Sequence, residues 1–364
     1  MANMKEIARI AGVSLGTVSN VLNGSARVRD PLRRRVEEAV QSIGYQPSAL
    51  ARGLRRDKTN MIGMVIPDVT NPFFPAVIRG AEDVAFSNGY RLVLCNTDND
   101  HVKELAHLNE LRTYLPAGLI VIPSNFSDLT KQAESYQRNG AAVVCIDRLP
   151  KRWQGDSVTV ANEHGAAAVT RHLIRLGHQR IAVIAGPLHL TNSEQRLRGF
   201  RRAMSEAGLP VPPEYVQETS FDVPGGRAKA MLLLRLLPRP TAIFAANDMI
   251  AMGVIEATRS LGLQCPGDLS IVGFDDLEFA SLLNPSLASV FQPGYQLGAT
   301  AARLLLDRVR GDTSPARHIV LETELRIRES VAPPVDASQP PQRRKAATAP
   351  TQGAKKGAST RRRS

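Results

Sequence analysis

The sequence predicts an α/β protein with a three-helix head at its N-terminus and a two-lobed body of doubly wound parallel sheets. Three observations predict this class. The first 46 residues hold three short amphipathic segments with capping residues. From residue 60 onward, runs rich in Val, Ile and Leu alternate with helical patterns, as in parallel sheets covered on both faces. The 364 residues, 43% of them apolar, are too many for one ordinary domain.

Capping residues and apolar spacing place the first two helices of the head. Asn3 and Glu6 have the spacing of a capping box at the start of the first helix, and Gly12 ends that helix. Ser14 can cap a second helix directly after the turn. The inward face of the second helix is expected to carry Val18, Val21 and Leu22.

A third helix is expected to begin at Asp30, which would act as the N-cap, with Pro31 in the first turn. It ends before Gly44. Its inward positions are Val36, Val40 and Ile43. Three helices in this arrangement predict a helix-turn-helix head.

The outward side of the second helix carries side chains that suit the major groove of DNA. Asn20 can make a bidentate contact with adenine, and Leu15 can touch a thymine methyl group. Thr17, Ser19 and Asn23 suit phosphate contacts, which position a protein without reading sequence. The alternative is a three-helix module for protein interaction, but the local positive charge favours DNA. Ser14 and Gly16 complete the predicted DNA-binding surface of the head.

Positive charge is concentrated at the two ends of the chain. The net charge is +12, of which residues 1–60 supply +6 and residues 333–364 supply +7, so the remaining residues sum to about −1. A basic head beside a near-neutral body is typical of a protein that binds a polyanion. Residues 333–364 are rich in Pro, Ala, Gln and Ser, and we expect them to form a disordered basic tail.

Composition also predicts the compartment. No apolar run is long enough to cross a membrane, and the N-terminus lacks the apolar core of a secretion signal. Cys95, Cys145 and Cys265 lie far apart, which favours reduced thiols over disulfides or a zinc site. We therefore expect a cytoplasmic, nucleoid-associated protein without a membrane partner.

Nothing in the sequence predicts an enzyme, a metal or a cofactor. The seven His residues show no metal-ligand spacing, and no phosphate-binding loop or nucleophile elbow occurs. Asp275 and Asp276 could be taken for a hydrolase pair. Adjacent residues at a strand end point apart, however, which disfavours catalysis by these two carboxylates.

Eight apolar runs and the helical stretches between them make up the body. The candidate strands are 61–67, 91–96, 118–123, 141–146, 157–161, 180–185, 242–246 and 269–274, and helical stretches include 76–88, 163–176, 194–207, 225–236 and 248–261. In parallel sheets, ligands bind beyond the carboxyl ends of the strands. Polar and aromatic residues follow several of these ends, which predicts a cleft between the lobes. They include Asp68, Asn71, Thr97, Asp98, Asn247, Asp248 and Asp275.

Two motifs carry a resemblance to a known family. Residues 11–23 contain Ala-Gly-Val-Ser, Thr-Val-Ser and Val-Leu-Asn, and residues 44–56 read Gly-Tyr-Gln-Pro-Ser-Ala-Leu-Ala-Arg-Gly-Leu-Arg-Arg. Over about residues 4–330 the chain resembles the lac repressor family, near its purine and ribose repressor branch. Gly16 departs from the family, because it has no side chain where relatives often contact a base, so no relative predicts the operator sequence.

The resemblance implies a domain plan. It consists of a DNA-binding head (1–46), a hinge helix and linker (47–59), and a periplasmic-binding-protein-like sensor (60–332). The sensor's lobes are expected to be 60–161 with 293–318 and 162–292 with 319–332. In the family the hinge helix forms on the operator and wedges a leucine, here Leu54, into the minor groove, with Ala51, Arg52 and Arg55 beside it. The alternative is an ordinary linker.

The resemblance also implies a set of ligand-binding residues: Phe73, Phe74, Asp147, Arg148, Arg196, Phe221, Asn247, Asp275 and, less securely, Gln292. Carboxylates, amides and guanidinium groups beside phenyl rings suit a polyhydroxylated ligand, so we expect a sugar or sugar derivative. A purine is the alternative. It is disfavoured by Leu190, which stands where the purine repressor uses a charged group.

Several of these residues have a plain structural alternative. Asp248 begins a helix and is better explained as an N-cap than as a ligand contact. Asp147 and Arg148 can form a structural ion pair. Phe73 and Phe74 can belong to the core.

The expected mechanism is linkage between two sites. Ligand closes the cleft of a homodimer and thereby alters hinge-helix formation on a pseudo-palindromic, double-stranded DNA operator. Helix 294–309, with Leu297, Ala301, Leu304 and Leu305, could serve packing or dimerisation, and packing is favoured. The basic tail either adds non-specific, salt-sensitive DNA affinity or is a solvated tail without a role.

Overall fold

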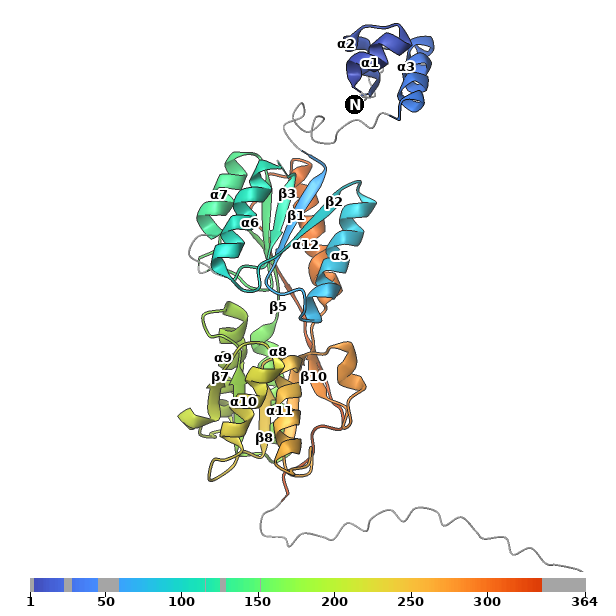
Figure 1. The fold of residues 1–364 in the computed structure, drawn as a ribbon. Coiled ribbons are helices and arrows are strands. Elements are labelled where there is room, and N and C mark those ends of the chain that lie inside the picture. The colour runs from blue at the N-terminus through green and yellow to red at the C-terminus, as the bar shows by residue number, and fades with distance from the viewer. Residues whose placement is uncertain are drawn as a thin grey trace, which may run out of the picture.

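The chain forms a small helical head and two stacked α/β lobes (Figure 1). The computed structural model describes residues 3–22, 28–44, 59–114, 116–124, 129–150 and 152–335. None of the helices within these ranges is long and apolar enough to cross a membrane.

The head consists of α1 (Met4–Ala11), α2 (Leu15–Leu22) and α3 (Asp30–Ser42). The Asn3 side chain accepts from the Glu6 N–H at 2.9 Å, and Gly12 ends α1 with a left-handed φ of 59°. The Ser14 hydroxyl accepts from the Thr17 N–H at 3.1 Å at the start of α2. Both predicted N-terminal caps and the predicted turn are therefore present.

The start of α3 differs from the prediction. Its N-cap is Arg29, which makes no side-chain cap hydrogen bond, and Asp30 is the first helical residue. Asp30 instead places its negative charge in the first turn, beside Pro31, where the helix dipole favours it. The three helices pack around a small apolar core of Ile7, Ala11, Val18, Val36 and Ala39, with Val21, Leu22, Val40 and Ile43 at its edge.

Lobe 1 contains a six-stranded parallel sheet of order β11-β5-β4-β3-β1-β2. Helices α5 and α12 cover one face, and α6 and α7 cover the other (Figure 1). The strands are β1 (Met61–Ile66), β2 (Arg91–Asn96), β3 (Gly118–Val121), β4 (Ala142–Ile146), β5 (Asp156–Val160) and β11 (His318–Leu321); the helices are α5 (Phe73–Ser87), α6 (His101–Thr113), α7 (Leu129–Arg138) and α12 (Gly294–Val309).

Lobe 2 repeats this plan with the order β12-β10-β9-β8-β6-β7, except that β12 is antiparallel. Helices α8 and α9 cover one face, and α10 and α11 cover the other. The strands are β6 (Ile181–Ala185), β7 (Val216–Glu218), β8 (Ala242–Ala245), β9 (Ser270–Asp275), β10 (Ala288–Phe291) and β12 (Glu324–Arg326); the helices are α8 (Asn162–Arg175), α9 (Thr191–Glu206), α10 (Val223–Leu233) and α11 (Asp248–Ser260), with 3-10 turns η1 (Pro213–Tyr215) and η2 (Glu278–Ser281).

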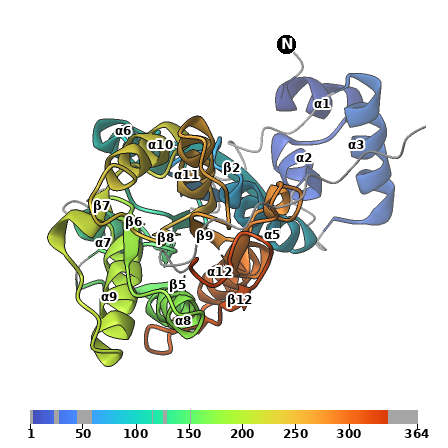
Figure 2. The same ribbon diagram turned by 90° about the horizontal axis from the view of Figure 1, so that it is seen from below.

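The chain crosses between the lobes three times: after β5, after β10 and after β11. Because β11 extends to Leu321 within the first sheet, the last crossing lies between Leu321 and Glu324, slightly later than the predicted boundary at residue 318. In Figure 2, which views the molecule from below, lobe 2 lies in front of lobe 1 because the two lobes are stacked along the viewing direction.

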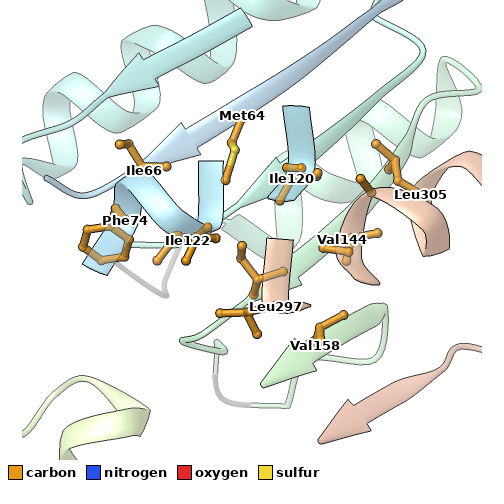
Figure 3. Packing of buried hydrophobic residues seen from close by; sticks show 14 of the residues in the cluster. Met64, Ile66, Phe74, Ile120, Ile122, Val144, Val158, Leu297 and Leu305 are labelled. Carbon is orange, nitrogen blue, oxygen red and sulfur yellow. The ribbon is translucent and has the colours of Figure 1, made fainter. Parts of the chain in front are cut away.

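The core of lobe 1 lies between its sheet and helices α5 and α12 (Figure 3). Alternate residues of β1 and β3 point into it, and Leu297, Ala301, Leu304 and Leu305 of α12 are all buried there. Packing therefore accounts for the apolar spacing of this helix. Phe74 also joins this core, which links it to the edge of the sheet that faces lobe 2.

Candidate functional site

A small cavity lies between the lobes, at the carboxyl ends of both sheets. Its volume is about 20 Å³, so the surrounding side chains nearly fill the space. All nine residues of the predicted ligand set line it, as do Asn71 and Asn192. The lining is Asn71, Phe73, Phe74, Asp147 and Arg148 from lobe 1, and Asn192, Arg196, Phe221, Asn247, Asp275 and Gln292 from lobe 2 and the crossing after β10.

Each lobe places an aspartate at the end of a buried strand. Asp147 directly follows β4 with a φ of 62°, and Asp275 ends β9 with a φ of 112°. Backbone in this region is strained for residues other than glycine and persists where surrounding contacts hold it. The two carboxylates are thereby turned from the sheet ends into the cleft.

The neighbour of Asp275 points elsewhere. Asp276 accepts from Arg326 at 2.6 Å and lies 2.6 Å from the guanidinium of Arg328, within lobe 2. The adjacent carboxylates therefore diverge, as predicted, and do not form a catalytic pair. Within the described ranges, no cluster of His, Cys, Asp and Glu could hold a metal ion.

Arg196 is held by its own lobe. It reaches the cleft from α9, donates from Nε to Asn162 Oδ1 at 2.8 Å and from Nη1 to the Ala246 carbonyl at 2.6 Å. Its guanidinium lies 3.9 Å from the centre of the Phe274 ring and 3.8 Å from Asp275 Oδ1. These contacts fix the cation against the carboxylate of the same lobe.

Arg148 is held more loosely. Its Nη1 donates to Asn99 Oδ1 at 3.0 Å, and its Nε lies 3.5 Å from Asp147 Oδ2. The guanidinium also lies over the Phe221 ring of lobe 2, at 5.8 Å from the ring centre. The ion pair expected as a structural alternative is present, yet its atoms also line the cleft.

Two hydrogen bonds join the lobes beside the cavity. Asn192 Nδ2 donates to Asp147 Oδ2 at 3.1 Å, and the Leu149 N–H donates to the Thr191 hydroxyl at 2.9 Å. Asn192 was not predicted from the sequence. Its signal is its position four residues before Arg196, which places both side chains on one face of α9.

Three buried polar atoms at the cavity have no hydrogen-bond partner among the described residues: Arg148 Nε, Asn247 Nδ2 and Gln292 Oε1. The opposite end of each amide is engaged. Asn247 Oδ1 accepts from the Ile250 N–H at 2.8 Å as the N-cap of α11, and Gln292 Nε2 donates to Asp275 Oδ1. Buried polar groups are nearly always paired in proteins, so these atoms are free to bind a ligand or an ordered water.

Asp248 is not the N-cap of α11, because Asn247 takes that position. The Asp248 carboxylate is fully buried and accepts from the Leu277 N–H at 2.8 Å and from the Ser289 hydroxyl at 2.6 Å. It therefore holds β9 and β10 together behind the cleft and does not line the cavity.

Burial dominates the electrostatics of the cleft. It raises the pKa of Asp275 to about 7, although Arg196 opposes this shift. It also raises the pKa of Asp147 and lowers the pKa of both Arg148 and Arg196. The cause is the cost of keeping a charge away from water, which a ligand with hydrogen-bonding groups would reduce.

Phenyl rings line the cavity from both lobes. Phe73 and Phe74 meet edge to face with ring centres 5.3 Å apart, and Phe221 lies on the opposite lobe. Both Phe73 and Phe74 also pack in the core of lobe 1. The structural and the ligand-facing explanations of these two residues therefore hold together.

The head presents the outward face of α2 to solvent. Leu15 is 43% exposed, and Ser14, Gly16 and Asn20 are exposed beside it. Thr17 and Ser19 are half-buried at the edge of this face. The other predicted DNA-binding residues lie outside the described residues: Asn23, Ala51, Arg52, Leu54 and Arg55.

Comparison with known proteins decides the family. A family model for bacterial regulatory proteins of the lacI family matches residues 3–48, and one for a periplasmic binding protein-like domain matches residues 170–331. The ribose operon repressor of Escherichia coli K12 is 38% identical over 333 residues, which cover 91% of this chain and all of the relative. The chain belongs to the lacI family. It is therefore a transcription regulator with a DNA-binding head and a ligand-binding sensor.

Two further lacI-family proteins are similar over nearly the whole chain. The repressor PurR of Photobacterium profundum is 35% identical, with 91% of this chain and 99% of the relative covered. A crystal structure of the lac repressor dimer bound to operator and the anti-inducer ONPF is 25% identical, with a TM-score of 0.81 and coverage of 91% and 99%. The described head and both lobes thus have counterparts in a DNA-bound relative.

Proposed function

We propose that this lacI-family protein is a repressor whose affinity for its operator is controlled by a sugar or sugar derivative bound between the lobes. The observation that carries the proposal is a set of buried atoms at the cavity that have no hydrogen-bond partner among the described residues: Arg148 Nε, Asn247 Nδ2 and Gln292 Oε1. Two of these atoms are donors and one is an acceptor, and their residues line the cavity together with Phe73, Phe74 and Phe221. Hydroxyl groups can both donate and accept, and the C–H faces of a sugar pack on aromatic rings.

The charges of the cleft support the same class. Asp147 and Asp275 lie on opposite lobes, each beside an arginine. A neutral polyol can accept from the guanidinium groups and donate to the carboxylates without adding a net charge to a buried site. An anionic or cationic ligand would leave one of these pairs unbalanced.

A purine-responsive regulator is the second candidate. Phe73, Phe74 and Phe221 could enclose a planar base, and a relative named PurR is 35% identical. Leu190, which precedes α9, is buried and is absent from the cavity lining, so it offers no polar group to a base. This favours the sugar.

The proposed partner is an operator with two-fold symmetry, bound by a homodimer, as in the DNA-bound lac repressor dimer. Ser14, Leu15, Gly16, Thr17, Ser19, Asn20 and Asn23 would contact the major groove and its phosphates, and Ala51, Arg52, Leu54 and Arg55 the minor groove. We also propose that the protein lies in the cytoplasm, at the nucleoid, where it would meet its operator.

The size of the cavity bears on mechanism. A monosaccharide needs far more than the 20 Å³ between the side chains, so binding requires the lobes or the lining side chains to move. Such movement would alter the contacts that join Asp147 and Leu149 to lobe 2. A ligand that favours one arrangement shifts operator affinity, and the operator shifts ligand affinity by the same factor.

The test is a thermal-shift screen of the full chain against monosaccharides, sugar phosphates, nucleosides and purines. A ligand present at a hundred times its Kd stabilises the folded state by about 2.7 kcal/mol. We expect a sugar to raise the melting temperature and Arg196→Ala to abolish that rise. A purine hit would replace the sugar proposal, and a screen without any hit would refute the cleft as a ligand site. Selection of bound duplexes from a random DNA pool tests the operator independently.

A further inference from the structure

The turn that follows β2 reaches the edge of the cleft and has a strained backbone. Asp98 and Asn99 are consecutive residues with left-handed φ angles of 54° and 57°. Such angles disfavour residues other than glycine, although Asn and Asp tolerate them better than most. Strained backbone persists where surrounding contacts hold it, and it often serves to aim a side chain.

Contacts within lobe 1 hold this turn in place. The Asn99 N–H donates to the Pro67 carbonyl at 2.9 Å. The Asp98 carboxylate accepts from Asn96 Nδ2 and from Lys103 Nζ, each at 2.5 Å. The side chain of Asp98 is therefore engaged on the surface of lobe 1, whereas the side chain of its neighbour Asn99 turns to the cleft.

Asn99 makes the main polar contact of the Arg148 guanidinium. Its Oδ1 accepts from Arg148 Nη1 at 3.0 Å. Among the described residues, no other side chain or carbonyl accepts a hydrogen bond from this guanidinium: Asp147 Oδ2 lies 3.5 Å from Nε, and the centre of the Phe221 ring lies 5.8 Å away. Because Arg148 is buried, little water is available to replace the contact with Asn99.

The choice of nitrogen matters for the cleft. The contact with Asn99 occupies Nη1 and leaves Nε and Nη2, which form another edge of the planar guanidinium and carry two parallel N–H donors. Arg148 lines the cavity, and its Nε has no hydrogen-bond partner among the described residues. A side chain held at one end loses less conformational freedom when its other end binds a ligand.

We infer that Asn99 is the positioning residue for Arg148. The left-handed turn aims the Asn99 amide oxygen at Nη1, and this contact holds the Nε and Nη2 donors ready for the ligand. Asn99 is exposed and does not line the cavity, so it acts through Arg148. The inference deepens the proposed function and rests on it in taking Arg148 as a ligand contact.

The first test measures how firmly Arg148 is held in the ligand-free full chain. Phenylglyoxal condenses with the terminal nitrogens of accessible arginines, and mass spectrometry of the peptide that contains Arg148 gives its rate of modification. Asn99→Gly accepts the left-handed backbone and removes the acceptor. Asp98→Gly is the matched control, because it changes the neighbouring left-handed residue, whose side chain contacts Asn96 and Lys103 instead.

We expect Arg148 to react about fivefold faster in Asn99→Gly, the value of one hydrogen bond, and less than about twofold faster in Asp98→Gly. Arg196, which is held within lobe 2, is the internal control and should react at the wild-type rate in both variants. Asn99→Asp keeps an acceptor for Nη1 and should restore the slow reaction of Arg148.

The second test measures sugar affinity from the dependence of the melting temperature on the concentration of D-ribose, D-glucose or D-galactose. For a sugar that stabilises the wild type, Asn99→Gly should weaken binding about fivefold. In an Arg148→Ala background the same change should weaken binding less than about twofold, because the group that Asn99 positions is gone. A merely structural role of the turn would weaken binding equally in both backgrounds.

Several results would overturn the inference. Equal acceleration at Arg148 and Arg196 would mean that Asn99→Gly opens the whole cleft. The same acceleration in Asp98→Gly would assign the effect to the turn backbone, and an unchanged rate in Asn99→Gly would show that the hydrogen bond does not hold Arg148. If no sugar or other ligand binds, the proposed function fails, while the modification rates still decide whether Asn99 positions Arg148. Sugar binding that Asn99→Gly leaves unchanged would refute the inference alone.

Discussion

Lobe 1 and lobe 2 each present one aspartate at a strand end and one arginine to the cleft between them. In lobe 2, Arg196 is fixed by Asn162, the Ala246 carbonyl and the Phe274 ring, all within that lobe. In lobe 1, Arg148 has one hydrogen bond, to Asn99, and a longer ion-pair contact with Asp147, and its guanidinium also lies over the Phe221 ring of lobe 2.

This difference suggests that the two lobes have different roles in ligand binding. Lobe 2 holds the more preorganised half of the proposed ligand site, because the contacts of Arg196 lie within that lobe. The loop at residues 147–149 of lobe 1 is bonded within its own lobe and also to Asn192 and Thr191 across the cleft. A ligand is therefore expected to bind lobe 2 first. Lobe 1, which follows the head in the sequence, is expected to move when the cleft closes.

Removal of the fixed arginine should have the largest effect. Arg196→Ala leaves Asp275 buried without its cation, so we expect the free energy of unfolding to fall by about 3 to 5 kcal/mol and ligand affinity by at least about 100-fold. Urea denaturation and calorimetry measure both. Arg198→Gln on the same helix breaks only exposed pairs and should cost less than about 1 kcal/mol. An equal cost for Arg148→Ala would contradict the contrast between the lobes.

A pH series should show the same contrast in the aspartates. Burial raises the pKa of Asp275 to about 7, whereas the unfolded carboxyl titrates near 3.8. The folded state then keeps a proton that the unfolded state releases. The contribution of Asp275 to stability is therefore largest below pH 4 and falls as the pH rises to 7, by up to about 1.4 kcal/mol per pH unit. Asp275→Asn, which is neutral throughout, should flatten this decline in urea denaturation; an unchanged slope would assign it to other groups.

The two ends of the Asn247 amide can be tested separately. Asn247→Ser keeps an acceptor for the Ile250 N–H and removes the unpartnered Nδ2 donor. We expect ligand affinity to fall about fivefold, the value of a neutral hydrogen bond, with little change in stability. Asn3→Ser, at the N-cap of α1 in the head, is the matched control, since it exchanges the same kind of cap outside the two lobes and should leave ligand affinity unchanged. Similar affinity losses in both variants would argue against a ligand contact.

The cross-lobe hydrogen bond of Thr191 should have the smallest effect. Thr191→Val removes the acceptor for the Leu149 N–H while keeping the side-chain shape, so closure should weaken and ligand affinity fall about twofold. Thr170→Val, whose hydroxyl donates within α8 to the Ala166 carbonyl, is the matched control. A larger loss in the control would show that the effect arises from packing within lobe 2.

Much of the cleft was predictable from sequence because one rule places its residues. Asp147 and Asp275 follow apolar runs that could only be buried strands, and parallel strands direct their carboxyl ends to one edge. The N-caps Asn3 and Ser14 were also predictable, because each side chain accepts from a backbone N–H only three residues further along the chain. These signals are local in the chain, so neighbouring residues suffice to read them.

The remainder depends on contacts between distant segments. Strands β7, β10, β11 and β12 are three or four residues long, and no residue of β7, β11 or β12 is fully buried. They therefore lack the long, buried apolar runs that predict the central strands. The choice of Asn247 over Asp248 as the cap depends on Leu277 and Ser289, which draw the Asp248 carboxylate away. The sequence around residue 248 does not reveal these contacts, so it could not predict which of the two residues caps the helix.

The three chain crossings between the lobes have a consequence for how such sensors diversify. A three-stranded tether leaves the lobes few ways to move, so ligands of different shape are expected to produce nearly the same displacement. Substitutions at the cleft can then change which molecule is recognised while the mechanical output reaching the head is preserved. Ligand specificity can therefore change during evolution while the coupling between the cleft and the head stays the same.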